Sequence, residues 1–213
     1  MGIFGDDKKC VICNREAGLL GGLTGTTLAD GSYLCSDCSG RCVGKCEFEK
    51  MKTQDVRDSI AAGEANKRRA EGDYHATRTF STGRARDVEL LTVDENHGWL
   101  MSPALDDGWV YDLDDIYTFS MDLEFEPLER GEKYDLNTEP FPELPKCPEG
   151  ARVSDATLTL RLLENAKGTD KIEVDLIPAI FRDLEDVRSA YACAHDFFEF
   201  MRLYRTKQRK RER

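Results

Sequence analysis

The sequence lacks any run of about 18 consecutive apolar residues, the length that a membrane-spanning helix needs. Its first seven residues, 1–7, contain no apolar segment typical of a signal peptide. Gly2 alone would suggest N-myristoylation, but Asp6 stands where that motif has Ser or Thr. These absences favour a cytoplasmic protein that is neither embedded in a membrane nor anchored to one.

Sequence motifs of common enzyme classes are also missing. There is no Gly-x-Ser-x-Gly elbow, no phosphate-binding loop and no dinucleotide fingerprint, and the glycine-rich residues 18–25 lack the Lys-Ser/Thr of a phosphate cradle. The three histidines, His75, His97 and His195, fall in three different predicted elements. We therefore expect a protein without enzymatic activity.

Charge is distributed unevenly along the chain. The formal net charge is −11, but residues 87–150 carry 18 acidic and 3 basic side chains, whereas residues 205–213 carry six basic and one acidic side chain. An acidic middle repels nucleic acid and anionic lipid, and a short basic end attracts either one weakly.

The cysteines carry the clearest chemical pattern. Six of the eight lie between residues 10 and 46, and four of these form two Cys-x2-Cys pairs, Cys10 with Cys13 and Cys35 with Cys38, with 21 residues between the pairs. In a reducing compartment this spacing is typical of a tetrahedral four-thiolate zinc site rather than of a disulfide framework. Four thiolates leave no position for water, so we expect one structural Zn²⁺ ion and no hydrolytic chemistry.

Other interpretations of these cysteines remain open. One pair could be a redox centre, although no βαβ pattern surrounds either pair, and four thiolates could also hold iron or an iron–sulfur cluster. If a helix begins near Cys35, then Cys38, Cys42 and Cys46 lie on nearly one face, so Cys42 could replace a ligand or join a second site. A second site would lack ligands, because no histidine precedes His75.

Composition and periodicity divide the chain into four regions. Residues 1–50 are rich in cysteine and glycine, and predict a small zinc-ribbon or treble-clef-like module with a hairpin that turns at Asp30-Gly31. Residues 51–73 predict a linker helix with Thr53 as its N-cap. Residues 74–204 predict a β domain with a C-terminal helix, and residues 205–213 predict a frayed basic tail.

The β domain shows seven strand patterns, separated by turns that contain Gly, Asp and Asn. They cover residues 76–80, 88–93, 98–101, 109–111, 116–125, 156–163 and 171–177. Between them, the proline-rich residues 126–150 lack periodicity and predict a long surface connection that contains the unpaired Cys147. From about Asp183 apolar residues recur every three or four positions, which predicts an amphipathic helix covering the sheet. The expected fold class is α+β.

Several segments resemble a known family. They are the opening Met-Gly-Ile-Phe-Gly, the two cysteine pairs, Gly18-Leu19-Leu20, Leu28-Ala29-Asp30-Gly31, Leu34-Cys35-Ser36-Asp37-Cys38, Glu64-Ala65-Asn66-Lys67 and Ala76-Thr77-Arg78-Thr79-Phe80. Over about the first 80 residues the chain looks like the bacterial proteins of domain of unknown function 4428. This resemblance implies a zinc-binding module followed by a pleckstrin-homology-like or GRAM-like domain, a bent antiparallel sheet or barrel closed by a C-terminal helix. Cys42, Cys46 and the acidic middle depart from that pattern.

Two further groups of residues have ordinary explanations. Asp106, Asp107, Asp112, Asp114 and Asp115 crowd predicted turns, but the spaced ligands of a calcium loop are absent, so solvated turn carboxylates are favoured. The aromatic residues Trp99, Trp109, Tyr111 and Tyr117 are typical of the core of a small barrel, with a ligand surface as the alternative.

Two main hypotheses of function follow, with an enzyme that has an unrecognised site as the third. The first is an interaction or adaptor protein, in which the zinc module is structural and the partner is a protein or peptide, with lipid as a weaker candidate. The second is a nucleic-acid-binding protein, in which Arg15, Lys45, Lys50 and the basic tail contact phosphates, against the repulsion of the acidic middle.

Overall fold

The computed structural model describes residues 9–16, 25–82, 88–105, 107–136, 141–163, 167–177 and 183–211. The chain divides into two compact units. The first unit comprises residues 1–72 and 164–169, and the second comprises residues 73–163 and 170–213. Each unit has its own cluster of buried apolar side chains. The helix expected over residues 51–73 belongs to the first unit except for its last residue.

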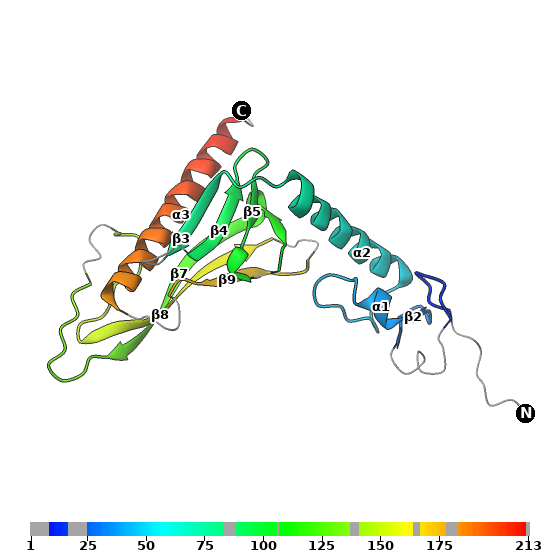
Figure 1. The fold of residues 1–213 in the computed structure, drawn as a ribbon, viewed down its shortest axis with the longest axis horizontal. Coiled ribbons are helices and arrows are strands. Elements are labelled where there is room, and N and C mark those ends of the chain that lie inside the picture. The colour runs from blue at the N-terminus through cyan, green and yellow to red at the C-terminus, as the bar shows by residue number, and fades with distance from the viewer. Residues whose placement is uncertain are drawn as a thin grey trace, which may run out of the picture. The chain divides into compact units, whose positions relative to one another are not determined.

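Short elements build the first unit (Figure 1). Strands β1 (Thr26–Thr27) and β2 (Tyr33–Leu34) pair antiparallel. Gly31 takes a φ of 81° in the turn between them, which confirms the hairpin predicted from the Asp-Gly pair. Helix α1 (Ser36–Ser39) follows β2 directly, and helix α2 (Thr53–Arg68) continues into a π-helical turn, Arg69–Asp73.

Helix α2 begins one residue earlier than predicted. Lys52, not Thr53, is its N-cap residue. The backbone N–H of Lys52 donates to Asp55 Oδ2 at 2.7 Å, and the backbone N–H of Thr53 donates to Asp30 Oδ2 at 2.8 Å. The two carboxylates thus satisfy amides that a helix start leaves unpaired, and Asp30 ties the helix to the hairpin turn.

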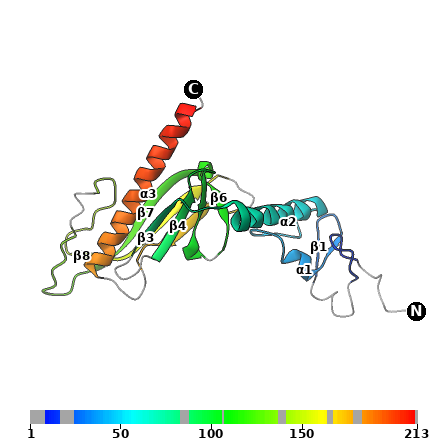
Figure 2. The ribbon, with the colours of Figure 1, turned by 45° about the horizontal axis from the view of Figure 1, so that its top comes forward.

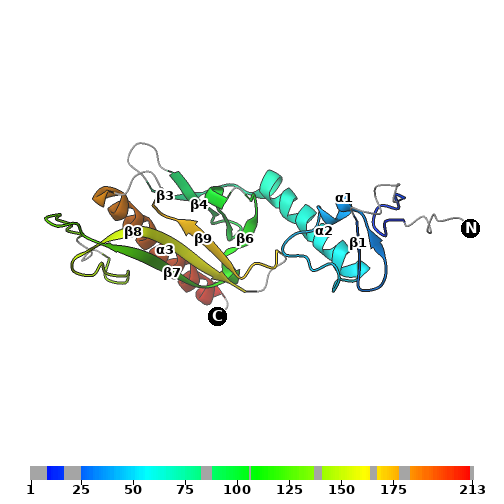
Figure 3. The same ribbon diagram turned by 90° about the horizontal axis from the view of Figure 1, so that it is seen from below.

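Two antiparallel sheets make up most of the second unit (Figure 3), and in the described residues they contain seven strands. Sequential order holds in both: β3 (Arg78–Thr82), β4 (Val88–Asp94), β5 (Trp99–Met101) and β6 (Val110–Asp112) in one, and β7 (Ile116–Pro127), β8 (Ala151–Leu162) and β9 (Lys171–Asp175) in the other. All seven predicted strands are present, and the largest error is in β8, which begins at Ala151 rather than at residue 156. Among the described residues no strand pairing joins the two sheets, so the single bent sheet or closed barrel that the resemblance implied is not seen there.

Helix α3 (Leu184–Arg211) provides the third layer of this unit (Figure 1). Phe197 and Phe200 of α3 pack on Phe80 of β3, with ring centroids 5.3 and 5.6 Å away. Leu158 and Leu160 of β8 are fully buried in the same cluster. The apolar stripe of the helix therefore closes the core between the sheets, as its periodicity predicted.

The basic end of the chain is not a frayed tail where the structure describes it, because α3 continues to Arg211 (Figure 2). Two contacts hold these last turns: Arg205 donates to the Ile116 carbonyl at 2.6 Å, and Gln208 Nε2 donates to the Tyr204 hydroxyl at 2.8 Å. Basic side chains in a last turn also interact favourably with the helix dipole. Although α3 is long, no helix of the described residues is long and apolar enough to cross a membrane.

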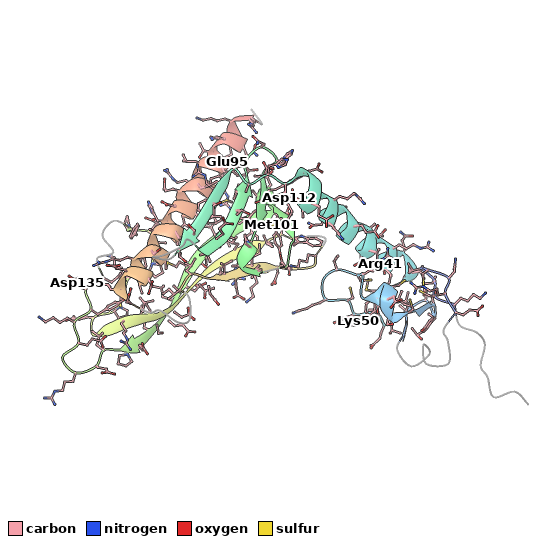
Figure 4. The ribbon with its side chains drawn as sticks, in the orientation of Figure 1. Arg41, Lys50, Glu95, Met101, Asp112 and Asp135 are labelled. Carbon is pink, nitrogen blue, oxygen red and sulfur yellow. The ribbon has the colours of Figure 1, made fainter. Side chains whose placement is uncertain are left out.

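Part of the connection between β7 and β8 packs on α3 rather than lying on the surface. Leu144 is buried, and the Tyr191 hydroxyl donates to the Pro145 carbonyl at 2.5 Å. Arg188 donates to the backbone carbonyl of Asp135, which lies beside the start of α3 in Figure 4. The prediction of a wholly superficial connection over residues 126–150 is therefore wrong.

Candidate metal centre

The first pair of cysteines lies in a tight turn. The Cys10 N–H donates to the Arg15 carbonyl at 2.9 Å, and the Asn14 N–H donates to the Cys10 carbonyl at 2.8 Å. Asn14 has a φ of 57°, a left-handed conformation that asparagine tolerates better than most residues. This turn reverses the chain, so Cys10 and Cys13 point their side chains to the same side.

The hairpin brings the second pair to the first. The Val11 N–H donates to the Tyr33 carbonyl at 2.9 Å, which ties the cysteine turn to β2. Cys35 follows β2, and Cys38 is buried in the single turn of α1, which the Ser39 N–H closes on the Cys35 carbonyl at 2.9 Å. The second pair thus belongs to a strand end and a helix start.

The four sulfur atoms converge on one point. All four Sγ atoms of Cys10, Cys13, Cys35 and Cys38 lie within 4.8 Å of one another, and the Cys13 and Cys35 sulfurs are 3.7 Å apart. A tetrahedron with Zn–S bonds of 2.3 Å has edges of about 3.8 Å. The distance is too long for a disulfide, and all eight cysteines are free thiols. These residues can therefore hold one metal ion, and the soft sulfur donors suit zinc.

The electrostatics of the site favour a bound cation. Burial opposes ionisation of Cys10, but backbone N–H groups, with that of Cys35 3.5 Å from its Sγ, outweigh burial and lower the pKa of Cys10 to about 6. Burial and the neighbouring thiols raise the pKa values of Cys35 and Cys38. A bound cation would favour the thiolate forms of Cys35 and Cys38, which burial disfavours.

A small apolar cluster supports the sulfurs from outside. Its buried members are Cys10, Leu28, Tyr33, Leu34, Cys38, Val56 and Ile60, so α2 contributes two of them. Ion pairs add links between the elements: Arg15 meets Asp37 at 2.8 Å, and Arg41, labelled in Figure 4, meets Glu64 of α2 at 2.5 Å. Helix α2 is therefore part of the metal module rather than only a linker.

Cys42 and Cys46 do not belong to the four-sulfur cluster among the described residues. Helix α1 ends at Ser39, so the single helical face considered for Cys38, Cys42 and Cys46 does not exist. The Cys42 thiol donates to the Cys38 carbonyl at 3.7 Å, and the Cys46 thiol donates to the Val43 carbonyl at 3.3 Å. Both thiols therefore face backbone oxygen atoms.

The aspartates and histidines of the second unit do not form a metal site among the described residues. Asp107 accepts hydrogen bonds from the Trp109 backbone and the Tyr111 hydroxyl, at 2.9 and 3.2 Å, and Asp106 lies outside the described residues. His195 pairs with Glu143, whereas His97 pairs with Asp94, so these two histidines have separate partners. These groups act as turn acceptors and ion-pair partners.

The aromatic residues considered as a ligand surface do not form one group. Tyr111 is buried in the core, and Trp109 packs partly against it. Trp99 instead stacks on His97, with ring centroids 4.5 Å apart, and Tyr117 is 52% exposed. Tyr111 and Trp109 therefore support the interpretation as core aromatics, whereas Trp99 and Tyr117 do not.

The sequence patterns missed a buried carboxylate at the end of β4. Asp94 is fully buried and accepts hydrogen bonds from the backbone N–H groups of His75, Asn96 and His97, at 3.1, 3.0 and 3.3 Å. Its Oδ2 also lies 2.8 Å from His97 Nδ1. Burial opposes ionisation, but these bonds outweigh it and lower the pKa of Asp94. The only sequence signal is the Asp-Glu-Asn-His-Gly run, which is typical of a turn.

No family model, curated protein or solved structure matches this chain. The resemblance to domain of unknown function 4428, and to a pleckstrin-homology-like or GRAM-like domain, therefore stays a prediction.

Proposed function

We propose that this chain is a non-enzymatic interaction protein whose first unit is held together by one structural Zn²⁺ ion. The convergence of four thiols within 4.8 Å carries the proposal. Four protein ligands would fill a tetrahedral zinc site, so no position is left for a substrate or an attacking water. The metal would stabilise a recognition module, and the second unit would offer the binding surface to a protein or peptide partner in the cytoplasm.

We further propose that the second unit is pleckstrin-homology-like. Seven antiparallel strands in two sequential sheets, followed by a helix that packs on both, support this assignment. Side chains of the helix join those of both sheets in one apolar core.

Nucleic-acid binding has less support as a second candidate. Two of the three first-unit cations proposed to contact phosphates are engaged within that unit: Arg15 pairs with Asp37, and Lys50 pairs with Glu47. Of these three, Lys45 alone has no ion pair among the described residues, so the hypothesis depends on Lys45 and the basic end of the chain. Binding to random-sequence DNA that falls steeply with salt would favour this candidate over the first.

Affinity capture from the native cell tests the interaction function. The wild-type chain and a Cys10→Ser/Cys13→Ser variant are compared, after metal analysis has shown one Zn²⁺ per wild-type chain and none in the variant. We expect the wild type to recover partners, and the variant to lose those that contact the metal module while keeping those that contact only the second unit. Recovery of the same partners by both would show that the metal module is not the recognition surface, and recovery of none would contradict the interaction function.

A further inference from the structure

A groove lies between strand β7 and the C-terminal half of α3 in the second unit. Its volume is about 420 Å³, which is large enough for one or two side chains. Its floor is aromatic, because Phe119 of β7 and Phe198 of α3 meet there with ring centroids 4.8 Å apart. Arginines of α3 form its rim, namely Arg202, Arg205 and Arg209.

The groove keeps uncompensated positive charge. Arg202 is paired with Glu199 at 2.6 Å. Arg205 bonds a neutral carbonyl and lies 5.0 Å above the Phe119 ring, so no carboxylate neutralises it in these contacts. Arg209 is exposed and has no ion pair in the described part of the chain. Glu143, the other carboxylate of the lining, contacts the His195 ring, so three arginines face two carboxylates and the lining keeps a net positive charge.

Strand β7 offers main-chain groups beside this groove. It is an edge strand, paired along its length with β8 and with no other strand of the described residues. The unpaired N–H and C=O groups of an edge strand are a template for an added strand. The bond from Arg205 to the Ile116 carbonyl shows that β7 and the last turns of α3 approach each other here.

A segment of the chain already packs on the turns of α3 that precede the groove, and its residues show which side chains that surface binds. In the segment Phe141-Pro142-Glu143, the Phe141 ring packs on Tyr191 and His195, with centroids 6.0 and 5.3 Å away. The Glu143 carboxylate pairs with the His195 ring. An apolar anchor followed by a carboxylate thus covers this part of the helix, and the groove lies beyond Glu143, which is part of its lining.

We propose that the groove binds an extended acidic peptide segment of a partner protein. An apolar side chain lies over Phe119 and Phe198, carboxylates meet Arg205 and Arg209, and the peptide backbone runs along β7. Arginine suits this role because its planar guanidinium binds a carboxylate with two hydrogen bonds. A nucleic acid fits less well than a short peptide, because its repeated phosphates would extend past the groove over residues 87–150, which carry 18 acidic and 3 basic side chains. The inference rests on the proposed interaction function and names the chemistry of the partner.

A displayed library of random eight-residue peptides tests the groove, with the full-length zinc-loaded chain as bait. We expect enrichment of sequences with an aromatic or aliphatic residue next to Asp or Glu. A fluorescein-labelled synthetic copy of an enriched peptide then gives the affinity by anisotropy. Arg209→Glu is expected to weaken binding about tenfold or more.

Lys210→Glu is the matched control, because Lys210 is exposed on the same helix but does not line the groove. It makes the same change in charge and is expected to alter affinity less than about twofold. Hydrogen exchange should slow in β7 and in the last turns of α3 when the peptide binds. Equal losses in both variants, or no enrichment of acidic peptides, would overturn the proposal.

A random single-stranded DNA oligonucleotide separates the other partner class. Tighter binding of this oligonucleotide than of any peptide, with the same dependence on Arg209, would also overturn the proposal. If affinity capture recovers zinc-dependent partners but no acidic peptide is selected, the groove assignment fails and the interaction function stands. If acidic peptides are selected but affinity capture recovers no partner, the groove assignment stands and the proposed interaction function fails.

Discussion

The two units of this chain bury apolar side chains to very different extents. Among the described residues, the buried cluster of the first unit has seven members, two of which are metal-ligand candidates, whereas that of the second unit has 27. A core of the first size cannot offset the conformational entropy lost on folding, and small domains of this kind generally depend on metals or disulfides. The comparison teaches that hydrophobic burial suffices for one unit, whereas the other has a small core beside four cysteines that could hold a metal ion.

The difference also concerns where charge is buried. In the first unit the buried thiols of Cys10 and Cys38 lie with two half-buried thiols in a cluster that could hold a metal ion. In the second unit the buried carboxylate of Asp94 is satisfied by three backbone N–H groups and a histidine. The stability of the first unit should therefore depend on a bound metal, and that of the second unit on core packing and on pH.

Removal of the metal should have the largest effect, and should be confined to the first unit. Binding of structural zinc contributes about 10–16 kcal/mol in small zinc-binding peptides, so Cys38→Ala should abolish the fold of that unit. Amide resonances of residues 25–68 should collapse to unfolded positions in NMR spectra, while those of β3 to β9 persist. Cys147→Ser, a substitution in the second unit, is the control and should keep one zinc per chain. Persistence of the dispersed resonances in the metal-free variant would contradict the comparison.

A substitution that leaves a cavity in the core of the second unit should destabilise that unit and leave the first unit unchanged. Phe197 is fully buried, so Phe197→Ala should lower the free energy of unfolding by about 3–5 kcal/mol. Both tryptophans, Trp99 and Trp109, belong to the second unit, so tryptophan fluorescence in urea follows this unit alone. Zinc content should not change. Leu163→Ala, at a site that is 52% exposed, should cost less than about 0.5 kcal/mol, and a similar loss in both variants would refute the role of burial.

Loss of the Asp94 charge should have an intermediate effect that depends on pH. Asp94→Asn should destabilise the second unit by about 1–3 kcal/mol at pH 7. Because the folded state lowers the pKa of Asp94, its contribution is complete above the unfolded-state pKa of about 3.9 and is lost as pH falls through the folded-state value. The wild type and the variant should therefore converge in acid, as measured by urea unfolding at several pH values. Asp135→Asn, with an exposed side chain, is the control and should change the free energy of unfolding by less than about 0.5 kcal/mol at pH 7.

Replacement of Cys42 should have the smallest effect. Because this thiol lies outside the four-sulfur cluster, Cys42→Ser should retain one zinc per chain and change stability by less than about 1 kcal/mol. The rate of zinc transfer to a colorimetric chelator is the measurement. Faster release than from the wild type, or a lower zinc content, would make Cys42 a ligand and would redraw the boundary of the metal module.

Local patterns predicted most of the elements in both units. The hairpin at Asp30-Gly31 and the stripe of α3 were correct because a turn type and a helical period depend on residues close in sequence. The prediction that residues 205–213 form a frayed tail was wrong for a different reason, because α3 continues to Arg211. Its basic residues have the composition of a solvated tail. The hydrogen bond from Arg205 to the Ile116 carbonyl, 89 positions away in the sequence, is a contact that local composition does not reveal.

The sequence by itself determined which four cysteines converge, since each pair is joined by two residues and a hairpin connects the pairs. It also determined the number of strands, through turns and alternation. Only the tertiary structure decided that the strands form two sheets, that Asp94 is buried, and that β7 lies beside the arginines of α3. These features depend on contacts between residues far apart in the chain, which periodicity and spacing do not encode.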